Sequence, residues 1–373
     1  MPVKMDLTSK LKQEFVIERI NALSQQQLEG PLVVELDTTE ACDLACPGCI
    51  SQDIMVTNNR FSNDRLMSIA EELNHSGVKA VILIGGGEPL AHPAVGQLIE
   101  YFGQNDIHVG ITTNGTFIRK HWKPISEYAS WTRVSVDAAT DEMFNILRPS
   151  KVGKSKFHFI IDNMRMLAEI KQGTLGFSFL IQTEADGPGL VSNVHEIYAA
   201  AELARDIGCD YFEVKPSYQF REDSNHALMI HRKDLMNQAK EQVSCLDELE
   251  TDNFTILKAI NLDHSLDGVV QEQPKSYTHC PVSELRTLVC PSGTYVCPYW
   301  RGKERMNIGD LHEQSFSEMW HGQRRKDTMA SLDPSKDCSF HCLRHDSNVE
   351  LLSMMNSDQA SRLSSIPEFD RFI

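Results

Sequence analysis

Three closely spaced cysteines are the residues of this chain most able to do chemistry. Cys42, Cys46 and Cys49 follow the pattern C-x3-C-x2-C directly after an apolar run at residues 32–36. Three thiolates on one loop can bind three irons of a four-iron, four-sulfur (4Fe-4S) cluster, because such clusters take cysteine thiolate ligands. The fourth iron then has an open position where chemistry can occur. A structural zinc site is the alternative, although zinc favours paired C-x2-C units and a fourth ligand.

A second group of cysteines lies in the last third of the chain: Cys280, Cys290, Cys297, Cys338 and Cys342. The segment 287–297 predicts a β-hairpin that turns at Ser292-Gly293. In that register Cys290 lies opposite Tyr295, and Cys290 and Cys297 point to one face because side chains on a face recur every two residues. This group indicates a second metal centre, with a zinc ribbon as the alternative.

Strand and helix patterns alternate from residue 31 to about residue 217. Apolar runs predict six strands, at residues 32–36, 79–84, 107–112, 132–136, 175–181 and 211–214. Helical periodicity fills the intervals between them, for example at residues 63–75 and 157–171. Six strand–helix units with apolar strands predict an α/β fold with a parallel sheet. We therefore expect a partial (β/α)6 TIM-like barrel, short of the eight units of a closed barrel.

Polar and glycine-rich segments follow these strands at their carboxyl ends, where the active sites of parallel sheets gather. Beyond the first cysteines, the candidates for cofactor binding are Gly85, Gly86, Gly87, Glu88, Pro89, Thr113, Asn114, Ser135, Asp137 and Gln182. A tight turn is the alternative role for the glycine run, and a helix N-cap for Asp137. For Thr113, Asn114 and Gln182 the alternative is turn chemistry. The catalytic candidates follow the sixth strand and could contact substrate or SAM, with a solvated surface position as the alternative: Lys215, Tyr218 and Arg221.

The domain organisation follows from the same patterns. We predict a helical lead-in (1–30), the barrel core (31–220), a helix and acidic linker (221–275), the second cysteine region (276–345) and a C-terminal tail (346–373). The second cysteine region is expected to be a small domain made of a β-hairpin and a helix.

The composition sets limits on location and partners. The chain is 41% hydrophobic and 24% charged, as in a soluble globular protein. Its net charge of −16, without a basic block, argues against nucleic acid as a partner. No apolar run has the length of a signal peptide or a membrane span, so we expect a cytoplasmic protein without a membrane partner. In that reducing compartment cysteines serve as ligands or core residues more often than as disulfides.

The cysteine loop and the glycine segment together resemble the radical S-adenosylmethionine (radical SAM) superfamily. The resemblance covers about residues 32–217 and rests on C-x3-C-x2-C followed by Gly-Gly-Gly-Glu-Pro at the end of the next strand. It implies that the segment containing Glu88 receives the ammonium group of SAM and that Asp137 binds ribose hydroxyls. One position departs from the family: the residue before the third cysteine is usually aromatic and packs near the adenine, but here it is Gly48.

The resemblance also implies the chemistry. The amino nitrogen and carboxylate of SAM bind the open iron, and one electron from the reduced cluster cleaves a carbon–sulfur bond. The products are methionine and a 5′-deoxyadenosyl radical, which abstracts hydrogen from the substrate. The electron would come from a donor such as flavodoxin or ferredoxin, and the open cluster implies sensitivity to oxygen.

The second cysteine region resembles the auxiliary-cluster extensions of the same superfamily, called SPASM or, when shortened, twitch domains. The resemblance covers about residues 277–345. It implies one auxiliary 4Fe-4S cluster on Cys280, Cys297, Cys338 and Cys342, with Cys290 as an alternative ligand. Two features depart from the family: the interval from Gly293 to Cys297 is one residue shorter than usual, and Cys290 stands at a usually apolar position.

The resemblance therefore implies a radical SAM enzyme, an oxidoreductase or a related transforming enzyme. Relatives with one auxiliary cluster often act on small polar compounds such as sugars and aminocyclitols, and relatives with two often act on peptides. We expect dehydrogenation or epimerisation of a small polar metabolite, with a peptide modified as in RiPP maturation as the alternative. An iron–sulfur electron carrier or scaffold is the alternative of another class, but a carrier has no need of the glycine segment.

Overall fold

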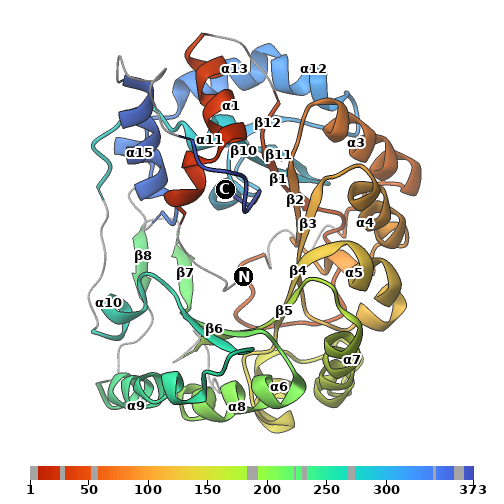
Figure 1. Cartoon of the computed structure of the whole chain (residues 1–373), viewed down its shortest axis with the longest axis vertical. Helices are drawn as coiled ribbons and strands as arrows, with labels where there is room; N and C mark the ends of the chain where they lie inside the picture. Colours follow the sequence, from red (N-terminus) through yellow and green to blue (C-terminus); the bar gives the residue numbers. More distant parts are fainter. Residues whose placement is uncertain are drawn as a thin grey trace.

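A curved, ten-stranded sheet forms the centre of the protein (Figure 1). The computed structural model describes residues 7–25, 30–51, 58–182, 192–221, 224–228, 233–267, 274–338, 342–356 and 365–373. The strand order is β12-β11-β10-β1-β2-β3-β4-β5-β6-β9. The strands curve around an interior. The loop that contains Cys42, Cys46 and Cys49 lines this interior, and so does the C-terminal end of the chain.

The six strands predicted from apolar runs are all present and pair in parallel with their neighbours. They are β1 (Val33–Asp37), β2 (Ala80–Ile84), β3 (His108–Thr113), β4 (Ala129–Ser135), β5 (Thr174–Ile181) and β6 (Tyr211–Pro216). Every residue of β1 is buried, as expected for a strand covered on both faces. The predicted parallel α/β barrel is thus confirmed.

Helices cover the outer face of this parallel sheet (Figure 1). They are α3 (Asn63–His75), α4 (Val95–Gln104), α5 (Trp122–Tyr128), α6 (Asp141–Leu147), α7 (Phe157–Ile170) and α8 (Ile197–Ile207). Helix α4 shows why they pack there: Val95, Leu98, Ile99 and Phe102 form one buried stripe at helical spacing. Ser62 caps α3, since its hydroxyl accepts a hydrogen bond from the backbone N–H of Arg65 at 3.1 Å.

The remaining elements lie around the two ends of the sheet. The helices are α1 (Glu14–Ser24), α9 (Lys233–Ser244), α10 (Leu262–Leu266), α11 (Val282–Leu285), α12 (Phe316–His321), α13 (Gln323–Ser331), α14 (Pro334–Asp337) and α15 (His345–Asn356). The short 3-10 turns are η1 (Ser9–Lys12), η2 (Pro89–Ala91), η3 (Ile118–Lys120), η4 (Val194–Glu196), η5 (Leu246–Leu249), η6 (Pro298–Trp300) and η7 (Glu304–Met306). Strands β7 (Tyr218–Arg221) and β8 (Ser224–Leu228) form a separate antiparallel pair. Among the described helices, none has the length and apolarity needed to cross a membrane.

The sheet continues beyond the predicted barrel on both sides. Strand β9 (Thr255–Lys258) pairs in parallel with β6, so the prediction of a linker at residues 221–275 is wrong for this strand. On the other side, β10 (Arg286–Cys290) pairs in parallel with β1. Strands β11 (Gly293–Tyr295) and β12 (Asn307–Gly309) follow it in antiparallel order. The second cysteine region is therefore joined to the barrel through backbone hydrogen bonds.

The predicted register of the β10–β11 hairpin is wrong by two residues. Cys290 pairs with Gly293 and Leu288 with Tyr295, so the loop consists of Pro291 and Ser292. Proline has no N–H to donate to a ladder and is therefore placed in the turn. Cys290 then packs with Leu288 and Tyr295 in a small apolar cluster instead of lying beside Cys297.

The last nine residues close the amino-terminal end of the barrel, where a polar tail was predicted. Phe372 is buried, and its ring lies 5.4 Å from the ring of Trp131 at the start of β4. The Gln13 side chain accepts hydrogen bonds from the backbone N–H groups of Phe369 and Asp370 at 2.7 and 2.9 Å. In Figure 1 the C-terminal end accordingly lies inside the ring of strands. This segment forms the floor of the barrel interior.

Candidate functional site

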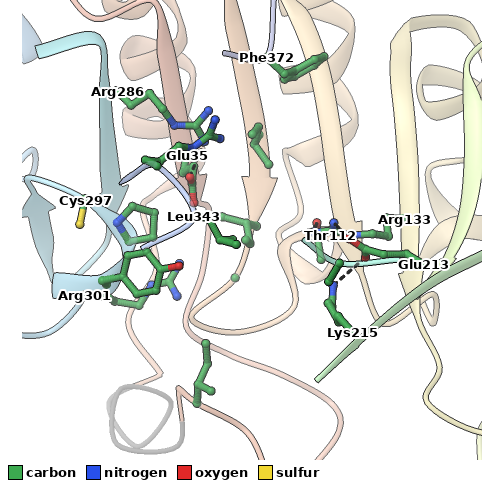
Figure 2. A pocket seen from close by; sticks show the side chains of 18 of the residues that line it. Glu35, Thr112, Arg133, Glu213, Lys215, Arg286, Cys297, Arg301, Leu343 and Phe372 are labelled. Carbon is green, nitrogen blue, oxygen red and sulfur yellow. Dashed lines mark hydrogen bonds and ion pairs between the residues drawn. The ribbon is translucent and has the colours of Figure 1, made fainter. Parts of the chain in front are cut away.

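A cavity of about 1520 Å³ occupies the barrel interior, between the cysteine loop and the floor formed by Phe372 (Figure 2). It brings together most of the residues that the sequence singled out. They are Cys42, Cys46, Cys49, Gly85, Gly86, Gly87, Glu88, Pro89, Thr113, Asn114, Ser135, Asp137, Gln182, Lys215, Cys280, Cys297, Cys338 and Cys342. Tyr218 and Arg221 lie on β7, and their side chains fall outside the described part of the structure.

The first cysteine loop is held from two sides. Its backbone pairs with the segment after α6, where Ala45 N–H donates to the carbonyl of Pro149 at 2.8 Å. On the other side, the Asp43 carboxylate accepts hydrogen bonds from the side chains of Asn114 at 2.9 Å and Thr116 at 3.2 Å. Asp43 lies within the cysteine motif but was not predicted as a site residue. These contacts fix the loop at the carboxyl ends of β1 and β3.

The thiols of this loop fit a cluster of which the protein supplies three ligands. Burial raises the pKa of Cys42 to about 12 and also raises the pKa of Cys46, although Arg148 opposes the shift at Cys46. Metal binding requires thiolates, which burial disfavours. A bound metal would supply the positive charge that stabilises these buried thiolates. Cys42, Cys46 and Cys49 all line the cavity, so an iron without a protein ligand would face its interior.

The glycine segment after β2 lies directly against the cysteine loop. A Cβ on Gly87 would overlap the carbonyl oxygen of Ala41, so only glycine allows this approach. The N–H of Gly86 donates to Asp37 at 2.8 Å, and the N–H of Glu88 donates to the carbonyl of Ala41 at 2.9 Å. The segment is therefore a tight turn, as in the alternative interpretation, and it also lines the cavity.

Glu88 is 2% exposed and joins the glycine segment to the end of β3. Its carboxylate accepts hydrogen bonds from Thr113 Oγ1 at 2.6 Å and from the N–H groups of Asn114 at 2.7 Å and Leu90 at 3.0 Å. Burial nevertheless raises the pKa of Glu88 to about 7. The carboxyl of Glu88 therefore changes between its neutral and its ionised form near neutral pH. A cation in the cavity would favour the ionised form.

Asp137 is held by an arginine that the sequence did not single out. Arg148 Nε donates to Asp137 Oδ2 at 2.8 Å, and the N–H of Leu180 donates to Oδ1 at 2.8 Å. The N-cap of α6 is Thr140, whose hydroxyl accepts from the N–H of Met143, so the N-cap alternative for Asp137 is wrong. Arg148 also lies 4.0 Å from the sulfur of Cys46, which links Asp137 to the cysteine loop.

The side chain of Gln182 lies beside Gly48, the position at which the cysteine loop departs from the family. A Cβ on Gly48 would point at the side chain of Gln182, 3.5 Å from its Oε1. The carboxamide thus lies on the side of the loop toward which a residue with a side chain at position 48 would project. The backbone of Gln182 is fixed by Asn193, whose Oδ1 accepts its N–H at 2.8 Å.

The second cysteine group divides into four neighbouring thiols and one separate thiol. The pKa of Cys297 is raised by burial and by the nearby thiols of Cys280, Cys342 and Cys338. Cys290 is also buried, but the charged groups nearest it are Asp37 and Arg301. Within the described ranges, no three His, Cys, Asp or Glu side chains are placed to share one metal ion. In a cluster the thiolates are instead spread over several irons.

The choice of auxiliary ligands can be tested by counting irons. In a protein with Cys42, Cys46 and Cys49 all replaced by alanine, we expect about four irons per chain to remain. Adding Cys297→Ala should remove most of this iron, whereas adding Cys290→Ala should leave it, because the Cys290 side chain packs with Leu288 and Tyr295. Iron analysis and the visible absorption of anaerobically reconstituted protein provide the measurement. Loss of iron in the Cys290 variant alone would reverse the assignment.

Comparisons with known proteins agree with this geometry. Residues 36–188 match the Radical SAM superfamily. The mycofactocin maturase MftC of Mycobacterium tuberculosis (strain CDC 1551 / Oshkosh) is 23% identical over 308 residues, which cover 82% of this chain and 74% of MftC.

Two solved structures share the fold. Streptococcus suis SuiB bound to its precursor peptide SuiA has a TM-score of 0.59 at 13% identity, covering 85% of this chain and 71% of SuiB. anSMEcpe with bound AdoMet and Cp18Cys peptide has a TM-score of 0.56 at 14% identity, covering 91% of each chain. With the cysteine loop, the glycine segment and the four neighbouring thiols in place, residues 36–188 form a domain of the Radical SAM superfamily, and the chain is similar to radical SAM enzymes that have an auxiliary-cluster region of the SPASM/twitch type.

Proposed function

We propose that this radical SAM enzyme modifies a peptide. The observation that carries the proposal is the size and lining of the cavity: about 1520 Å³, with the first cysteine loop and the four neighbouring thiols both on its wall. Small-molecule sites usually occupy about 300–1,000 Å³. This interior would have to hold two clusters and SAM, and its wall extends between the two cysteine groups, where a segment of a larger substrate would lie.

The comparisons support a peptide over the small polar metabolite expected from the sequence. MftC is named a maturase, and both SuiB and anSMEcpe have been solved with peptides bound. The expectation of a sugar or aminocyclitol drew on the number of auxiliary clusters. The alternative, a peptide modified as in RiPP maturation, thus becomes the leading hypothesis.

The proposed roles of the residues follow from their positions. Cys42, Cys46 and Cys49 would hold the cluster that binds SAM, and the four neighbouring thiols would hold the auxiliary cluster. When bound, the cluster and SAM supply the radical that abstracts hydrogen. Glu88 would face the amino group of SAM, Asp137 the ribose and Gln182 the adenine. The floor around Phe372 and Trp131 would exclude water from the interior. A small electron donor such as flavodoxin or ferredoxin would reduce the cluster.

The substrate class is tested with reconstituted enzyme, SAM and dithionite under anaerobic conditions. One set of reactions receives a pool of short synthetic peptides, and a matched set receives a pool of sugars and aminocyclitols. We expect the peptides to raise 5′-deoxyadenosine above its substrate-free level, with a mass change in at least one peptide by mass spectrometry. Stimulation by the sugar and aminocyclitol pool alone would overturn the proposal.

The role of Glu88 predicts how SAM binding depends on pH. Because the pKa of Glu88 is raised to about 7, its carboxyl is largely protonated at pH 6 and ionised at pH 8. An amino group that binds iron is uncharged but donates N–H hydrogen bonds, which an ionised carboxylate accepts better than a protonated one, so SAM should bind about tenfold more weakly at pH 6 than at pH 8. Glu88→Gln should bind weakly at both values. Calorimetric titration of reconstituted protein with SAM measures this, and an unchanged pH dependence in Glu88→Gln would contradict the assigned role.

A further inference from the structure

Two cations and one carboxylate lie together on the barrel wall, below the carboxyl ends of β4 and β6. Arg133 Nη1 lies 3.1 Å from Glu213 Oε1, and Lys215 Nζ lies 2.7 Å from Glu213 Oε2. Arg133 also donates to Thr112 Oγ1 at 3.1 Å. Figure 2 shows these four side chains gathered on one side of the cavity. Only Lys215 was singled out by the sequence.

This group carries an excess of positive charge into the cavity of an acidic protein. Two cations share Glu213, which is 4% exposed, so the formal charge of the group is +1. Among the described residues, two other carboxylates near this group already have arginine partners. Glu35 is 2.6 Å from Arg286, and Asp137 is held by Arg148. A partly buried cation without a counterion is unfavourable, so within the described part of the chain this group lacks one anion.

The wall around Arg133 is rigid. A Cβ on Gly110 would overlap the ring of Trp131, and a Cβ on Gly176 would overlap the ring of Tyr211. These glycines on β3 and β5 therefore allow two aromatic rings to lie against the neighbouring strands. The guanidinium of Arg133 lies 5.7 Å from the centroid of the Trp131 ring. Arg133 also donates hydrogen bonds to Glu213 and Thr112, so its guanidinium is held in one orientation before any ligand binds.

We propose that Arg133 and Lys215 bind a carboxylate of the substrate. A carboxylate can accept hydrogen bonds from both cations at once, and such charge-assisted bonds are the strong ones. The inference rests on the proposed function and names the group that the peptide presents inside the barrel. That group is either the side chain of an acidic residue or a carboxylate at the end of the peptide.

Two pairs of small probes distinguish these sources. N-Acetyl-L-aspartate N-methylamide presents a side-chain carboxylate, and N-acetyl-L-alanine presents a terminal one. The corresponding asparagine and alaninamide compounds are uncharged controls of the same size. We expect one carboxylate to bind the reconstituted full-length protein about tenfold more tightly than its amide, by calorimetry. Because burial lowers the pKa of Lys215, a pH of 6.5 is chosen to favour its protonated form, and low chloride keeps the site free of competing anions.

Three variants should change carboxylate binding in opposite directions. Arg133→Gln and Lys215→Gln each remove the excess charge and should weaken binding about tenfold, whereas Glu213→Gln frees both cations and should strengthen it by a similar factor. A group with a purely structural role would not give this reversal. Arg133→Lys keeps the charge and should lose less affinity than Arg133→Gln, so the test holds even where Glu213→Gln does not fold.

Several results would overturn the inference. Equal binding of a carboxylate and its amide by the wild-type protein is one, and equal affinities of all the variants are another. Loss of probe binding at saturating SAM is a third, because the cations would then hold the carboxylate of SAM itself. If the probes bind as expected while the peptide pool gives no stimulation, the proposed function fails and the carboxylate site stands.

Discussion

Replacing Cys46 with alanine is expected to reduce the formation of 5′-deoxyadenosine from SAM and dithionite to the level of a reaction without enzyme. The side chain of Cys46 lines the cavity and contacts Arg148, so its loss removes one of only three thiolates proposed for the first cluster. The chemistry belongs to the cluster and SAM, so no other side chain can replace it. Iron content should fall together with the activity, while iron at the second cysteine group should remain.

Cys245→Ser is the matched control for this experiment. Cys245 is exposed and lies after α9, away from both cysteine groups. We expect it to keep wild-type iron content and wild-type yield of 5′-deoxyadenosine. Thermal unfolding of both variants separates loss of the cluster from loss of the fold. A Cys46→Ala protein that retains its iron and its yield would contradict the assignment of this loop.

The parallel barrel could be predicted because most of its strands are largely buried and therefore contain apolar runs. Strand β2 (Ala80–Ile84) is an example, and its ends were placed within one residue. Strand β9 was missed because it has only four residues, and a charged residue, Lys258, stands at its end. The position of β9 in the sheet is determined by its pairing with β6, and the local sequence pattern does not show this pairing. The predicted hairpin register was wrong because Pro291, which has no N–H to donate to the ladder, lies in the turn together with Ser292.

The site was predictable where its residues form a motif and hidden where they act through distant partners. The first cysteines and the glycine segment have a spacing that carries information by itself. No such spacing marks the charged residues Arg148, Arg133 and Glu213. Each of them has a role that depends on a partner from another strand or loop. Cys290 shows the converse, since its proximity to other cysteines in the sequence suggested a ligand while the fold places it elsewhere.

Removing the side chain of Asp37 should strongly destabilise the protein, because this residue joins the barrel to the second cysteine region. Asp37 is fully buried at the end of β1. It accepts hydrogen bonds from Gly86 N–H at 2.8 Å and from Arg301 Nη2 at 3.0 Å. Asp37→Ala leaves Arg301 buried without its carboxylate, which typically lowers the free energy of unfolding by about 3–5 kcal/mol.

Two further variants test whether this loss of stability comes from the buried charge of Arg301 that Asp37→Ala leaves unpaired. Asp267→Ala removes an exposed carboxylate that pairs with Lys240 and should change stability by less than about 1 kcal/mol. The double variant Asp37→Ala/Arg301→Met removes both charges and should recover most of the loss, because an apolar pair can replace a buried ion pair. Urea unfolding followed by circular dichroism gives the free energies. If the double variant is as unstable as Asp37→Ala, the stability lies in the hydrogen bond to Gly86, and the glycine segment depends on Asp37 directly.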